Sequence, residues 1–118
     1  VGAKADIGNS VVAKGCEVLG EVKNSVLSYN TQVGEGAVVS YSVLMPGAVV
    51  ESGAVVQYAI VGESCRIGRD AQVGAPPETA QDPDDWGVAV LGPGTVIGNG
   101  EIVSAKTLLD RHHGEVKA

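Results

Sequence analysis

The aliphatic residues of this chain recur in steps of six, six and five residues, and this spacing limits the possible folds more than any other feature. Three segments of 17 residues, which start at Asn24, Tyr41 and Tyr58, align without gaps. The recurring positions, here called the inner column, are Val12, Val18, Val22, Leu27, Val33, Val39, Leu44, Val50, Val56, Val61, Ile67, Val73, Leu91, Ile97 and Val103. Amphipathic helices and alternating strands have other periods, whereas a stack of short repeated strands fits this one. The sequence therefore predicts a solenoid with this column inside.

Small residues and glycines mark the corners between the strands. A small residue comes four positions after most inner-column residues, at Cys16, Thr31, Ala37, Ala48, Ala54, Cys65, Ala71 and Thr95. The position three residues after an inner-column residue is often glycine, at Gly36, Gly47, Gly53, Gly94 and Gly100, where a tight corner can require a positive φ. Each repeat is thus a short strand and a corner, three to a coil. We expect an all-β, three-sided parallel β-helix of about five coils, with neighbouring coils about 4.8 Å apart.

The residue that precedes each inner-column position is expected to face outward, because neighbouring side chains of a strand point to opposite faces. On one side of the solenoid these residues are all aliphatic: Val11, Val26, Val43 and Ile60. We call this row the outward ridge. A continuous exposed aliphatic row usually marks a partner surface, so Val26, Val43 and Ile60 are predicted interface residues. The alternative is that branched residues stand there only because strands favour them.

The inner column is interrupted once. Residues 74–87 read GAPPETAQDPDDWG, with three of the five prolines and the only tryptophan, so we expect a loop at 75–87 that leaves the coil. Its aspartates lack the spacing and the glycine of a calcium-binding loop, and we interpret them as solvated charges. The predicted organisation is a β-helix domain over residues 1–109 and a C-terminal tail over 110–118.

Charge and residue types exclude several functions. The net charge of −6 argues against nucleic acid or an anionic membrane as a partner, and no apolar stretch approaches the roughly 18 residues of a membrane span. We expect a cytoplasmic protein. His112 and His113 are the only histidines and lie in the tail, so we predict no catalytic, cofactor or metal site in the coils. Cys16 and Cys65, three coils apart, are expected to be small core residues.

Four sequence motifs resemble the C-terminal domain of ADP-glucose pyrophosphorylases, the glucose-1-phosphate adenylyltransferases. They are AKGCEV, GEVKNSVL, VGEGAVV and SVLMPGA, in this order, and the resemblance covers nearly the whole chain. It implies left-handed coils and an N-terminal nucleotide-binding domain, absent from this chain, that uses Mg²⁺ to join ATP and glucose 1-phosphate. It also implies a homo- or hetero-tetramer in which the β-helix contributes to assembly and to a pocket for a phosphorylated effector.

A phosphorylated effector would require cations, and the candidates are Arg66, Arg69 and Lys106, with Arg111 near the end of the chain. Several relatives have a basic residue after the strand that follows the loop, where this chain has Gly92 and Pro93. The identity of the effector is therefore open. Two other functions remain as alternatives, namely a free-standing hexapeptide-repeat acyltransferase, which would normally have histidines on its coils, and a non-catalytic scaffold subunit.

Overall fold

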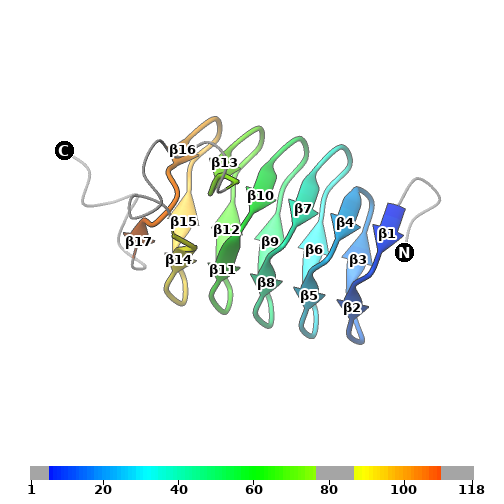
Figure 1. The fold of residues 1–118 in the computed structure, drawn as a ribbon. Helices are drawn as coiled ribbons and strands as arrows, with labels where there is room; N and C mark the ends of the chain where they lie inside the picture. The colour runs from blue at the N-terminus through cyan, green and yellow to red at the C-terminus, as the bar shows by residue number, and fades with distance from the viewer. Residues whose placement is uncertain (1–5, 77–86, 110–118) are drawn as a thin grey trace.

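The computed structural model describes residues 6–76 and 87–109 as three parallel sheets wound into one solenoid (Figure 1). Sheet A contains β1 (Asp6–Gly8), β4 (Glu21–Lys23), β7 (Val38–Ser40), β10 (Val55–Gln57), β13 (Gln72–Val73) and β16 (Ile102–Val103). Sheet B contains β2 (Val11–Val12), β5 (Val26–Leu27), β8 (Val43–Leu44), β11 (Ala59–Val61), β14 (Ala89–Leu91) and β17 (Leu108–Leu109). Sheet C contains β3 (Glu17–Val18), β6 (Gln32–Val33), β9 (Val49–Val50), β12 (Arg66–Ile67) and β15 (Val96–Ile97).

Each coil contributes one strand to each sheet, and every strand pairs in parallel with the strand one coil away. This confirms the predicted all-β, three-sided solenoid of about five coils, and it is consistent with the left-handed β-helix that the resemblance implies. The corners are named here by the sheets they join: A–B, B–C and C–A.

The predicted inner column forms the core. Fourteen of its fifteen residues are at most 4% exposed, and Val12, in the first coil, is partly buried against the others. The five-residue step also predicted Leu108 as the next inner residue after Val103, and this was wrong: Leu108 is 77% exposed and Leu109 packs against the core, because the last A–B corner is one residue longer than the earlier uninterrupted ones. The sequence did not predict that Ile7 would pack against the core, or that Ala59 and Ala89 would be buried in it. The core is therefore a stack of aliphatic layers along the solenoid. Burial of this apolar surface is the main contribution to the stability of the fold.

The five predicted corner glycines have positive φ, as expected, with values of 71° to 78°. Asn30, Ser64 and Asp70 occupy the equivalent place in other corners, also with positive φ. Polar side chains of this kind tolerate the left-handed conformation better than branched ones. The corner geometry therefore requires a backbone conformation more than one particular residue.

A ladder of serines, which was not predicted from the sequence, forms hydrogen bonds with the backbone of the A–B corner. The Ser42 backbone N–H donates to Ser25 Oγ at 3.1 Å, and the Ala59 N–H donates to Ser42 Oγ at 3.2 Å. Ser42 Oγ in turn donates to the Ser40 carbonyl at 2.8 Å. Ser10 accepts the Ser25 N–H in the same way, one coil earlier. These hydroxyls satisfy backbone groups that would otherwise lack partners inside the corner.

Both cysteines are free, as predicted. Cys65 is fully buried in the B–C corner, and its Sγ donates to the Gly92 carbonyl at 3.0 Å. Burial raises the pKa of the Cys65 thiol above its ordinary value of 9.0, although hydrogen bonds with Thr95 act in the opposite direction. Cys16 is only half-buried, because it lies in the first coil.

The interruption of the column occurs where the sequence places it. Sheet A ends its strand at Val73, and the chain returns to sheet B in register, with Ala59 opposite Ala89 and Val61 opposite Leu91. Most of the predicted loop, residues 77–86, lies outside the described residues, as does the predicted tail at 110–118. The division into a domain and a tail stays a prediction.

Candidate functional site

The outward ridge is the longest uniform feature on the surface of the solenoid. Strand register places Val11, Val26, Val43, Ile60, Val90 and Leu108 in one row down the outer face of sheet B. Val26 and Ile60 are each 40% exposed, and Leu108 is 77% exposed. The predicted ridge ended at Ile60 and did not include Val90, although Val90 precedes an inward leucine as Val43 does. Leu108 is on the ridge because Leu109, and not Leu108 as predicted, faces inward. The ridge therefore includes one residue from each of the six strands of sheet B.

Large side chains flank the ridge on both of its corners. On the A–B corner, the rings of Tyr41 and Tyr58 are stacked, with centroids 4.8 Å apart and planes within 7°. Both tyrosines have φ near +50°, an uncommon conformation for a bulky residue. On the B–C corner, Tyr29 and Met45 are exposed. Tyrosine and methionine are enriched at protein interfaces, so the whole face has the composition of a contact surface.

The outer rows of the other two sheets are mixed. Sheet C presents Glu17, Gln32, Val49, Arg66 and Val96 in register, and sheet A presents Glu21, Val38, Val55, Gln72 and Ile102. Polar or charged residues interrupt both rows, although Val38 and Val55 of sheet A are direct neighbours in register. Only the face of sheet B, among the residues described, therefore carries an unbroken aliphatic row.

The structure brings together two of the three candidate effector-binding cations. Arg66 points outward from β12, and its Nε lies 3.4 Å from Glu51 Oε2. Arg69 follows in the adjoining C–A corner, where Asn99 Oδ1 accepts its backbone N–H. Lys106 lies on the A–B corner of the last coil, across the prism from sheet C. One small ligand therefore cannot contact all three within a single chain. Arg111 lies outside the described residues.

A shallow hollow of about 190 Å³ lies beside Arg66 on sheet C. Its lining includes Glu17 and Glu51 as well as Arg66, so two carboxylates accompany the one guanidinium. This balance disfavours a phosphate in the hollow unless other cations join it. The effector-binding roles of Arg66, Arg69 and Lys106 stay predictions.

The described residues contain no cluster of three or more histidine, cysteine or acidic side chains that could hold a metal ion. Histidine does not occur at all in residues 6–76 and 87–109. Over the same ranges, the chain forms no helix of the length and apolarity needed to cross a membrane.

Comparison with known proteins places these features in a family. Residues 2–97 match the family model described as GlmU-like, C-terminal hexapeptide. The glucose-1-phosphate adenylyltransferase of Desulfitobacterium hafniense (strain DSM 10664 / DCB-2) is 35% identical over 113 residues, which are 91% of this chain and 28% of that protein. That of Clostridioides difficile (strain 630) is 49% identical over 49 residues, which are 42% of this chain and 13% of that protein. The chain thus spans less than a third of the length of these relatives.

Among solved structures, the acetyltransferase domain of PglB from Neisseria gonorrhoeae superposes with a TM-score of 0.55, at 16% identity. The superposition covers 89% of this chain and 48% of that one, and at this identity it supports the fold alone. The family match, by contrast, extends over most of the sequence and includes the strands from β1 to β15. This chain therefore belongs to the family of GlmU-like C-terminal hexapeptide domains.

Proposed function

We propose that this chain is the C-terminal assembly and regulatory region of a glucose-1-phosphate adenylyltransferase. The parent enzyme would convert ATP and glucose 1-phosphate into ADP-glucose and pyrophosphate for glycogen or starch synthesis. The observation that carries the proposal is the similarity to the D. hafniense enzyme along 91% of this chain. Because that similarity covers only 28% of the enzyme, the nucleotide-binding chemistry, including Mg²⁺ with ATP, is assigned to a region outside this chain.

Assembly is assigned to the outward ridge. Six aliphatic residues in a row, flanked by Tyr41 and Tyr58, provide an apolar face that a partner can cover. The partners would be the nucleotide-binding domain of the same polypeptide and other subunits of a tetramer. A cytoplasmic location is part of this proposal.

Regulation is assigned to Arg66 and Arg69, which lie within one coil, and separately to Lys106 on the opposite corner. A phosphorylated effector that meets these cations in one state of the enzyme only would shift the equilibrium between states. Since the arginines and the lysine lie on different sides of the prism, we expect them to contact different ligands, domains or subunits. Their effects on effector response should then be additive, whereas those of the two arginines should be coupled.

A hexapeptide-repeat acyltransferase is the second candidate, and the shared fold with the PglB acetyltransferase domain is compatible with it. The described coils lack histidine, the usual catalytic residue of such enzymes according to the resemblance. A scaffold subunit without catalysis is the third candidate. It differs from the first only in whether the parent protein turns over substrate.

The deciding experiment transfers this chain into an active enzyme. In the D. hafniense adenylyltransferase, the 113-residue region that matches would be replaced by this chain, and ADP-glucose synthesis would be measured with and without sugar phosphates and AMP. We expect synthesis to be retained, and Arg66→Ala, Arg69→Ala and Lys106→Ala to alter effector response more than the unstimulated rate. Acyl transfer by the isolated chain would contradict the proposal. An unaltered effector response in all three variants would contradict only the assigned sites.

A further inference from the structure

One C–A corner is two residues shorter than the others. From Val18 to Val22 the inner column advances by four residues, whereas it advances by six in each of the four later C–A corners. The short corner runs through Leu19, Gly20 and Glu21. At Gly20 the chain comes so close to the carbonyls of Gly34 and Ala37 that a Cβ atom would collide with them. The chain therefore takes a shorter path here, and no full corner stacks on the C–A corner of the next coil.

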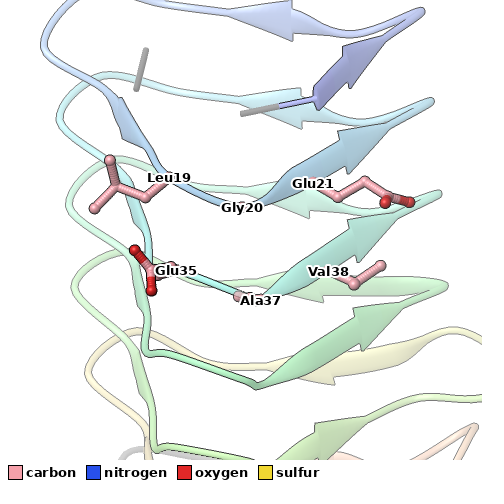
Figure 2. Close-up of a pocket in the computed structure, with 7 residues that line it drawn as sticks. Leu19, Gly20, Glu21, Glu35, Ala37 and Val38 are labelled. Carbon is pink, nitrogen blue, oxygen red and sulfur yellow. The ribbon is translucent and has the colours of Figure 1, made fainter. Parts of the chain in front are cut away.

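The shortening leaves a hollow of about 330 Å³ on the surface, here called the corner hollow (Figure 2). It is lined by Leu19, Gly20, Glu21, Glu35, Gly36, Ala37 and Val38. Figure 2 shows Leu19 and Glu35 on one side of it and Glu21 and Val38 on the other. The hollow thus takes the place of two omitted corner residues.

One backbone donor loses its acceptor because of this omission. In the later C–A corners, a backbone N–H donates to a carbonyl of the preceding coil, from Gly100 to Arg69 at 2.8 Å, from Asp70 to Ser52 at 3.1 Å and from Gly53 to Glu35 at 3.1 Å. Gly36 is the next member of this ladder, and no carbonyl of the described residues accepts its N–H. By the geometry of the ladder, this N–H faces the preceding coil, which is where the hollow lies.

The charge of the hollow is negative. Glu21 forms an ion pair with Lys23, at 3.6 Å between Oε2 and Nζ. Glu35 is exposed and has neither an ion pair nor a side-chain hydrogen bond to the described residues. Leu19, 37% exposed, adds an apolar wall beside Glu35. A suitable occupant combines a hydrogen-bond acceptor for the Gly36 N–H, a cation for Glu35 and an apolar stem for Leu19.

We propose that the corner hollow binds an extended segment of a partner protein that carries a lysine or an arginine. A main-chain carbonyl of the segment accepts the Gly36 N–H, and the basic side chain passes over Leu19 to Glu35. A peptide segment supplies all three features: a main-chain carbonyl, a cation and the apolar stem of the basic side chain. Its carbonyl restores the hydrogen bond to the Gly36 N–H that a full corner would have made. This proposal does not depend on the parent enzyme, because it uses only residues of this chain.

The test is a titration of the ¹⁵N-labelled chain, followed by NMR. The probe is the blocked tripeptide acetyl-Gly-Lys-Gly-amide, and the controls are the same peptide with norleucine in place of lysine, and n-butylamine. We expect the lysine peptide to shift the Gly36 amide resonance with a Kd on the order of 1 mM, because so small a ligand makes few contacts. The Asp70 resonance should not move, since its N–H is paired with the Ser52 carbonyl, one coil further from the hollow.

Two variants separate the site from the general surface charge. Glu35→Gln should weaken binding about two- to fivefold, as expected for one exposed ion pair. Glu63→Gln is the matched control and should not change binding. Glu63 has the same place in its repeat, but there the N–H of the next residue, Ser64, is accepted by the Pro46 carbonyl. Insertion of Ser-Gly between Leu19 and Gly20 should abolish binding, because the restored corner supplies the missing carbonyl.

Several results would overturn the proposal. One is an unmoved Gly36 resonance, and another is equal binding by the insertion variant. Butylamine that binds as tightly as the lysine peptide would make the hollow a site for small cations. A Gly36 shift with protein concentration alone would identify a second copy as the occupant.

Discussion

Sheets B and C share one backbone plan and one kind of interior, yet their outer faces differ. Inward, both present fully buried aliphatic residues, such as Leu44 on β8 and Val50 on β9. Outward, sheet B presents an unbroken aliphatic row, whereas sheet C interrupts its row with Glu17, Gln32 and Arg66. The backbone requires neither pattern, and we propose that the difference reflects what each face contacts. The inward residues therefore stabilise the fold, whereas the outward residues are free to differ between the two sheets.

The largest expected effect comes from charging the shared interior. Val50→Asp on sheet C and Leu44→Asp on sheet B should each cost several kcal/mol of unfolding free energy, because each buries a carboxylate without a partner. Val49→Asp should cost far less, since Val49 faces outward. Denaturant unfolding followed by circular dichroism measures all three. If Val50→Asp unfolds at the same denaturant concentration as the parent, the assignment of the inner column to the core is wrong.

A smaller effect is expected at the A–B corner, on the edge of sheet B. Ser42→Ala removes the acceptor of the Ala59 N–H and should cost about 1–2 kcal/mol of unfolding free energy. Alanine fits this place, because Ala59 occupies it one coil later. Ser52→Ala, at an exposed position of a C–A corner, is the control and should have almost no effect. Equal unfolding free energies for the two variants would show that the serine ladder does not stabilise the corner.

The smallest effect is a pH dependence at the B–C corner, which joins the two compared sheets. Because burial raises the pKa of Cys65, the unfolded chain ionises this thiol first as pH rises. The contribution of Cys65 is therefore constant below the unfolded pKa, near 9.0, and falls above it. We expect the alkaline loss of stability to be smaller in Cys65→Ala than in the parent, as measured by denaturant unfolding at pH 7 and pH 10. Identical losses would contradict the burial of the thiol.

The sequence predicted the interior better than the surface, for a physical reason. Inner positions such as Leu27 and Val33 must satisfy the same geometry in every coil, so they repeat. Ile7 and Val90 were missed because the repeat is irregular in the first coil and interrupted before β14. Leu108 was wrongly placed inside because the last A–B corner has one residue more than the earlier uninterrupted ones. The four-residue step from Val18 to Val22 was visible in the sequence. That the Gly36 N–H lacks an acceptor could be recognised only from the hydrogen bonds between coils in the structure.

The candidate sites were predictable only in part. That Val26, Val43 and Ile60 share a row follows from counting repeats, and strand register confirms the row. The nearness of Arg66 and Arg69 follows equally from their spacing. The position of Lys106 across the prism depends on how the chain resumes after the interruption. The Glu51 partner of Arg66 depends on side-chain conformation, which repeat counting does not specify.

The central claim, that the outer face of sheet B is the assembly surface, is tested most directly by sedimentation equilibrium of a matched pair of variants. Val43→Glu and Val49→Glu place the same charge on adjacent strands of one coil, at outward positions that are both half-buried. Both variants should keep the circular dichroism of the parent. We expect Val43→Glu to weaken self-association of the 118-residue chain at least tenfold, because the charge would enter an apolar contact, and Val49→Glu to leave it unchanged. Equal association of the two variants, or a parent chain that stays monomeric at every concentration, would contradict the claim.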